Sequence, residues 1–159
     1  KWETSNYELA KKFLNSYDPV TLETIKEDIV QTYGGDQLAK ILERPLDDQV
    51  HPYVAGVHEY ESGSTDVGDV GYAAPTLNLN VSTCCIGNVG HTWQMTAQAG
   101  SVLGHKGLLT AAKALALSTI RTMESPEVME AAKAEFVAKT GGVYHCPLPD
   151  DVKPPVGRY

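Results

Sequence analysis

The chain has 159 residues, of which 42% are hydrophobic and 21% are charged, a composition typical of a soluble globular protein. Thirteen basic and 20 acidic residues give a formal net charge of −7, which argues against nucleic acid or an anionic membrane surface as the main partner. No apolar run approaches the ~20 residues that a membrane-spanning helix needs. The length suits one domain, so we expect residues 1–159 to form a single unit.

The chain begins with a pattern typical of a helix. Trp2, Leu9 and Phe13 recur at roughly helical spacing, so these side chains are expected to lie on one face. Ser5 or Asn6 is the candidate N-cap.

A second helix is marked at both ends. Asp18 and Pro19 have the residue types preferred at the N-cap and at the first helical position, and a pair of glycines from Gly34 ends the apolar stripe. A short third helix is expected over 36–43, followed by an acidic loop and extended chain over 45–61.

The middle of the chain is predicted to be extended. Polar and apolar residues alternate over Thr76–Thr83, so that Leu77, Leu79 and Val81 face one way, which is the period of a strand. The segment His91–Gly100 is predicted to be another extended segment.

Two helices are expected near the end. Ser101–Met123 is rich in alanine and leucine and is apolar around most of its circumference, which is typical of a helix buried against a sheet. Ser125 and Pro126 begin a more amphipathic helix that Gly141 ends, and a proline-rich tail is expected to run as an extended strap.

This order of elements predicts an α/β fold, a partial three-layer α/β/α domain with few strands and with helices at both ends. Two or three strands are few for such a fold, so the sheet is expected to be incomplete.

The segment GSTDVGD is open to two interpretations. Ser64 or Thr65 caps a following turn through Asp66, which makes the segment a helix N-terminus. Alternatively, the same oxygens form a rim beside a metal or a substrate, where Gly63 and Gly68 permit unusual backbone dihedrals.

Among the five histidines, His91 is the strongest candidate for a site. It lies in the glycine-hinged loop GNVGHTWQ, where its imidazole can point into a cleft and bind a metal such as zinc. The alternative is a hydrogen-bonded structural histidine. His105 is expected to pack or cap at the start of the long helix, and His51, His58 and His145 lack a convincing partner spacing.

The cysteines favour free thiols. Cys84 and Cys85 are neighbours and Cys146 lies far away, so the three residues cannot all pair. This pattern suits a reducing, cytoplasmic location better than a disulfide framework. The adjacent pair also lacks the two-residue separation of a zinc knuckle.

Four segments carry a family resemblance: GSTDVGDV, GHTWQ, GHKGLLTAAKALA and AKAEFVAKTGGVYHCPLPDDVKPP. From about Asp47 to Pro155, the chain resembles the C-terminal part of the amidohydrolases that are like the B subunit of aminobenzoyl-glutamate hydrolase. These are similar to the co-catalytic metallopeptidases, which include aminoacylases and glutamate carboxypeptidases. The helical start of the chain fits the family only loosely.

The resemblance implies a zinc-exopeptidase-like catalytic domain with a two-metal site for zinc or manganese, and an inserted lid that dimerises. It implies cleavage of an amide bond in an aminobenzoyl-glutamate-like or N-acyl amino acid substrate. It makes His91 a metal ligand, and it gives Ser64, Thr65, Asp66 and His105 substrate-side or supporting roles.

The chain also departs from that family. The remaining ligands come from a His-x-Asp segment and from a Glu-Glu pair that holds the general base, and the sequence contains neither. We therefore expect no catalytic residue within the chain, which corresponds to the C-terminal segment of a metal-dependent amidohydrolase without its lid or N-terminal half, and we expect it to be inactive in isolation.

The expected partners are a small-molecule amide substrate and either the remaining part of the enzyme or a second copy of the chain. The alternative function is that of a non-catalytic α/β binding or interaction module.

Overall fold

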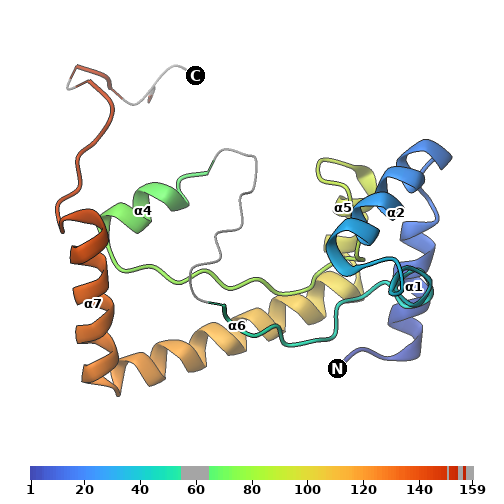
Figure 1. The fold of residues 1–159 in the computed structure, drawn as a ribbon, viewed down its shortest axis with the longest axis horizontal. Helices are drawn as coiled ribbons and strands as arrows, with labels where there is room; N and C mark the ends of the chain where they lie inside the picture. The colour runs from blue at the N-terminus through green and yellow to red at the C-terminus, as the bar shows by residue number, and fades with distance from the viewer. Residues whose placement is uncertain (55–64, 150, 154–155, 157–159) are drawn as a thin grey trace. The chain divides into compact units, whose positions relative to one another are not determined.

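The structure is a computed structural model that describes residues 1–54, 65–149, 151–153 and 156 (Figure 1). Ser64 and His58, for which the sequence raised possible roles, lie outside the described residues. Within these ranges, no helix combines the length and the apolar character needed to cross a bilayer.

The chain divides into two compact units. Unit 1 comprises Lys1–Val57 and Leu79–Ser118, and unit 2 comprises His58–Asn78 and Thr119–Tyr159.

The described secondary structure consists of seven helices. They are α1 (Thr4–Leu14), α2 (Pro19–Tyr33), α3 (Leu38–Glu43), α4 (Val67–Ala73), α5 (Trp93–Ala99), α6 (Val102–Met123) and α7 (Pro126–Thr140). No strand occurs in the described part of the chain, so the predicted α/β fold class, with its three-layer α/β/α arrangement, is wrong.

The two segments predicted to be extended show why. Thr76–Thr83 alternates as expected but pairs with no neighbouring strand, and Leu77 remains 74% exposed. Alternation predicts a strand only where another strand is available to complete its hydrogen bonds. His91–Gly100 instead contains helix α5, because Thr92 Oγ1 accepts a hydrogen bond from the Met95 amide at 3.3 Å and caps the helix.

The helices with clear end signals form where they were expected. In α2, the Asp18 carboxylate accepts hydrogen bonds from the amides of Val20 and Thr21, at 3.0 and 3.1 Å, as an N-cap does. Helix α1 is capped differently from the prediction: its N-cap is Glu3, whose amide donates to Asn6 Oδ1 at 3.0 Å in a capping box.

Unit 1 contains the hydrophobic core. The core is built from α1, α2 and α3 with the turns that follow α1 and α3, the loop before α5 and the first turn of α6. Its buried members are Tyr7, Ala10, Leu14, Tyr17, Ile25, Ile29, Ile41, Leu46, Cys85 and Leu103. The core therefore holds segments distant in sequence, including the loop that precedes α5.

Helix α6 is buried only near its start. Leu103 is fully buried, and the Lys106 ammonium lies 2.9 Å from both Glu3 Oε1 and Asn6 Oδ1 on α1. Farther along, six large apolar side chains are 49–73% exposed: Leu108, Leu109, Leu115, Leu117, Ile120 and Met123. The predicted burial of the whole helix is therefore wrong, since the described residues contain no sheet to cover it.

Unit 2 has little interior. None of the residues of α4 or α7 is buried. The Tyr144 hydroxyl donates to Asp69 Oδ1 at 3.2 Å, which links the chain after α7 to α4.

Candidate functional site

The loop of residues 85–92 holds His91 just before α5. Its first part is attached to the core, because Cys85 is buried and the Ile86 amide donates to the Pro45 carbonyl at 2.9 Å. At its other end, Thr92 Oγ1 donates to the Val89 carbonyl at 2.8 Å. Both ends of the loop are thus held by hydrogen bonds.

Gln98 of α5 is the main polar support of this loop. Its side chain is completely buried, and its Oε1 accepts a hydrogen bond from the Cys85 amide at 2.7 Å. Its Nε2 donates to Asn88 Oδ1 at 2.8 Å. A buried amide with both ends paired fixes the backbone that it contacts.

A second support comes from Tyr17, in the turn between α1 and α2. The Tyr17 hydroxyl donates to Asn88 Oδ1 at 3.3 Å and accepts a hydrogen bond from the Val89 amide at 2.9 Å. The loop is therefore held from two elements that are more than 70 residues apart in sequence.

His91 lies in a turn at the exposed end of this loop. Its φ is 58°, and among the described residues no other residue except glycine has a positive φ. This left-handed conformation is uncommon for residues with a Cβ, and it occurs disproportionately at functional sites. The imidazole is exposed and thus accessible to a ligand.

The other residues singled out in the sequence occupy simpler positions. His105 is exposed in the first turn of α6, in unit 1 with His91. Thr65 and Asp66 belong to unit 2 and are exposed at the start of α4, where the Val67 amide donates to Thr65 Oγ1 at 3.3 Å. A helix therefore begins in this segment, as the first interpretation held, but its N-cap residue Asp66 makes no side-chain capping hydrogen bond.

These residues do not complete a metal site. No group of three or more histidine, cysteine, aspartate or glutamate residues in the described ranges is placed to hold a metal ion. A catalytic zinc takes about three protein ligands, so His91 fits such a site only as one member of a larger set.

The buried thiol of Cys85 contributes little nucleophilic chemistry. All three cysteines are free, and burial together with the neighbouring Cys84 raises the pKa of Cys85 to about 11. Since only the thiolate is a strong nucleophile or metal ligand, Cys85 acts as part of the core.

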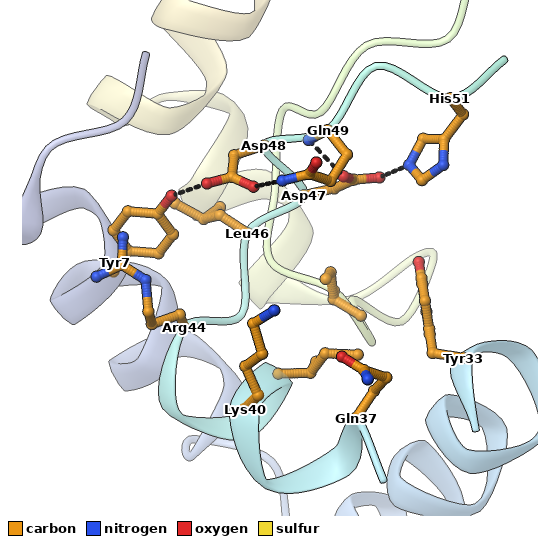
Figure 2. Close-up of a pocket in the computed structure, with 12 residues that line it drawn as sticks. Tyr7, Tyr33, Gln37, Lys40, Arg44, Leu46, Asp47, Asp48, Gln49 and His51 are labelled. Atoms are coloured by element: carbon orange, nitrogen blue, oxygen red, sulfur yellow. Dashed lines mark hydrogen bonds and ion pairs between the residues drawn. The ribbon is translucent and has the colours of Figure 1, made fainter. Parts of the chain in front are cut away.

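Unit 1 also contains a pocket of about 390 Å³ that the sequence did not reveal (Figure 2). It lies between the end of α2, helix α3 and the loop of residues 46–51, and we call it the α3 pocket. Figure 2 shows Lys40 and Arg44 on one side, and Asp47, Asp48 and His51 on the other. The signal that the sequence offered was the four-residue spacing of two cations, Lys40 near the end of α3 and Arg44 directly after this helix.

The acidic side of the α3 pocket is internally paired. Asp48 accepts hydrogen bonds from the Tyr7 hydroxyl at 2.7 Å and from Gln49 Nε2 at 2.5 Å. Asp47 lies 2.7 Å from His51 Nε2 and accepts from the Gln49 amide at 3.0 Å. The hydrogen bond from Tyr7 is the main cause that lowers the pKa of Asp48.

This pairing predicts a pH dependence of unit 1. The pKa of Asp48 is lower in the folded state, so its contribution is fully present above the ordinary value of 3.8 and is lost as the pH falls through the folded value. We expect Tyr7→Phe to reduce the loss of urea resistance between about pH 5.5 and about pH 3. Tyr53→Phe is the matched control, because Tyr53 is 90% exposed. Equal pH profiles for Tyr7→Phe and wild type would contradict the assignment.

A scan against protein-family models found no match, and a search of solved structures found no match either. Among curated proteins, the B subunit of p-aminobenzoyl-glutamate hydrolase from Escherichia coli (strain K12) is 34% identical over 113 residues. The match covers 70% of this chain and 23% of the relative. A continuous match of that length includes the middle of the chain, where His91 and His105 lie.

The match confirms the resemblance inferred from the four sequence segments, and the chain spans about a quarter of the length of that relative. The chain is therefore similar, over 70% of its own length, to part of the B subunit of p-aminobenzoyl-glutamate hydrolase.

Proposed function

We propose that the chain supplies part of a metal-dependent amide hydrolase that cleaves aminobenzoyl-glutamate-like or N-acyl amino acid substrates. The relationship to a protein named as part of p-aminobenzoyl-glutamate hydrolase supports the reaction and the substrate class. Because the match covers 23% of that relative, the activity of a complete enzyme requires residues beyond the match.

His91 is the residue that we propose as a ligand of zinc or manganese. The observation that carries this assignment is the exposed imidazole in a left-handed turn. Folding alone favours glycine at such a position, whereas metal binding requires the imidazole. The buried Gln98 and the Tyr17 hydroxyl hold the loop that presents it.

Supporting roles are assigned to the remaining residues named by the resemblance. His105 lies in unit 1, and Thr65 and Asp66 lie at the start of α4. We propose that these residues, with Ser64, act on the substrate side or support the site. The isolated 159-residue chain is expected to be inactive, because its described residues form no metal-binding group of three.

The proposal is tested in a chimera, in which the matching residues of this chain replace their counterparts in the E. coli relative. With Zn²⁺ or Mn²⁺, the chimera should hydrolyse p-aminobenzoyl-glutamate, and the isolated chain should not. His91→Ala should lower kcat/KM by ~100-fold or more. Mutation of a residue that only hydrogen-bonds to a metal ligand already lowers activity or metal affinity by roughly 10- to 100-fold, and loss of the ligand itself should cost more. His91→Ala should also lower the metal content.

His51→Ala is the matched control, because His51 is an exposed histidine of unit 1 that we assign no role in hydrolysis. It should leave both the rate and the metal content unchanged. Full metal content in His91→Ala would remove this residue from the ligand set. Hydrolysis by the isolated chain would contradict the proposal that the activity requires residues of a longer enzyme.

A further inference from the structure

We propose that the α3 pocket binds a small carboxylate that carries a flat apolar group, with the carboxylate held at Lys40. The pocket volume of about 390 Å³ falls within the range of ~300–1,000 Å³ that is usual for small-molecule sites. The proposal rests on which polar groups of the pocket are already paired and which remain available to a ligand.

The charged group of the pocket that remains available for a hydrogen bond is a cation. Lys40 has no hydrogen-bond or ion-pair partner among the described residues, and Figure 2 shows its ammonium group directed into the pocket. The Asp48 carboxylate already accepts two hydrogen bonds. The Asp47 carboxylate accepts one from the Gln49 amide and lies against His51. An anion that brings its own acceptor atoms therefore complements the pocket better than a cation does.

Arg44 adds a second positive group whose position is fixed. Its guanidinium carbon lies 3.7 Å from the centre of the Tyr7 ring, in a cation–π contact. The Tyr7 hydroxyl in turn donates to Asp48. Because Asp48 lies near Arg44 and offsets part of its charge, Lys40 is the principal anchor for an anionic ligand.

The remaining lining favours an apolar body with flat faces. Ile41 and Leu46 are buried members of the core that reach the pocket, and Ile86 also lines it. On the α2 side, the Tyr33 hydroxyl has no partner among the described residues. Burial and then the charge of Asp47 raise the pKa of Tyr33, which keeps this hydroxyl protonated as a donor near neutral pH.

This site is independent of the proposed function. None of the pocket residues is among those assigned to hydrolysis, so loss of carboxylate binding would leave the assignment of His91 intact. Conversely, a chimera without hydrolase activity would leave the α3 pocket intact.

The test is a titration of the full 159-residue chain with benzoate, followed by ¹⁵N NMR. We expect saturable shifts confined to residues around the pocket, with a Kd of about 10 mM or tighter for a ligand of this size. Lys40→Met should weaken binding by ~10-fold or more, as expected for loss of a charge-assisted hydrogen bond. Tyr33→Phe should weaken binding less.

Matched controls separate the pocket from general surface effects. Lys12→Met removes another exposed lysine of unit 1 whose ammonium group has no partner among the described residues, and it should leave benzoate binding unchanged. Benzamide tests the need for charge and acetate tests the need for a ring, so both should bind more weakly than benzoate. The proposal is overturned if benzoate does not saturate, if Lys40→Met and Lys12→Met behave alike, or if acetate or benzamide binds as tightly as benzoate.

Discussion

Gly104→Ala in α6 is expected to lower the free energy of unfolding of unit 1 by about 2–3 kcal/mol, the upper part of the range of about 1–3 kcal/mol that is typical of overpacking. The same substitution inside a helix ordinarily stabilises it by ~1 kcal/mol. Here, an added Cβ would lie 2.3 Å from the Ala99 carbonyl oxygen and 2.8 Å from two further backbone atoms of that residue.

The sign reverses because the neighbour is backbone. Gly104 is buried where the end of α5 approaches the first turn of α6, so neither helix can move away without disturbing the core around Leu103. Gly107 has a similar environment: a Cβ there would lie 2.4 Å from the Ser82 carbonyl oxygen. The same loss of stability is therefore expected for Gly107→Ala.

Urea denaturation followed by tryptophan fluorescence measures this effect, because Trp2 and Trp93 both belong to unit 1. Gly90→Ala is the matched control, since a Cβ at this position of the same unit meets no atom within 4 Å. It should be neutral or slightly stabilising. If Gly104→Ala were as stable as Gly90→Ala, the close contact between α5 and α6 would be refuted.

Gln98→Leu is expected to lower the free energy of unfolding of unit 1 by about 3 kcal/mol, and to release the loop that holds His91. Leucine is similar in size but leaves the Cys85 amide without its acceptor and removes one of the donors to Asn88. Each buried polar group that loses its partner costs about 1–3 kcal/mol.

Two measurements distinguish the loop effect from simple loss of stability. The first is the urea midpoint, for which Gln31→Leu is the control because Gln31 is exposed on α2 and should change stability by less than about 0.5 kcal/mol. The second is the contact between the amide and Hα protons of His91 in NMR, which is short at positive φ. This signal should weaken in Gln98→Leu under conditions where the protein remains folded.

Gln98→Glu provides a second test. As a carboxylate it keeps an acceptor for the Cys85 amide, but it loses the donor to Asn88 and places a charge at a fully buried position, so at neutral pH it should destabilise unit 1 at least as much as Gln98→Leu. Equal effects of Gln98→Leu and Gln31→Leu would contradict the role of Gln98 in holding the loop.

The sequence predicted well those helices whose signals are local. Asp18 with Pro19 at one end and Gly34 at the other define α2, and Ser125 with Pro126 begins α7. These signals depend on hydrogen bonds within a few residues, so they can be recognised without knowledge of the fold.

The predictions that failed depended on distant partners. Leu77 and Leu79 alternate as in a strand, but the described structure provides no second strand beside them. Likewise, α6 was expected to lie against a sheet, and Leu117 and Ile120 are instead 60% and 52% exposed. An apolar pattern indicates which face prefers burial, whereas the covering element depends on tertiary structure.

The candidate site was predictable in part. His91 was identified from its glycine-hinged loop and from the family resemblance, and its role as a metal ligand stays a prediction. Its left-handed backbone and its support by Gln98 depend on contacts across many residues. The α3 pocket was missed, because Tyr7 and Asp48 are 41 residues apart and only the fold brings them together.

The turn at His91 also limits how this position can change during evolution. β-branched residues are strongly disfavoured at a φ of 58°, whereas glycine adopts this conformation with little strain. Neutral drift in descendants without a use for the imidazole would therefore lead toward glycine, or toward asparagine and aspartate. Persistence of histidine across diverged descendants would be a sign of selection on the side chain itself, since glycine, asparagine and aspartate are also accepted by this backbone.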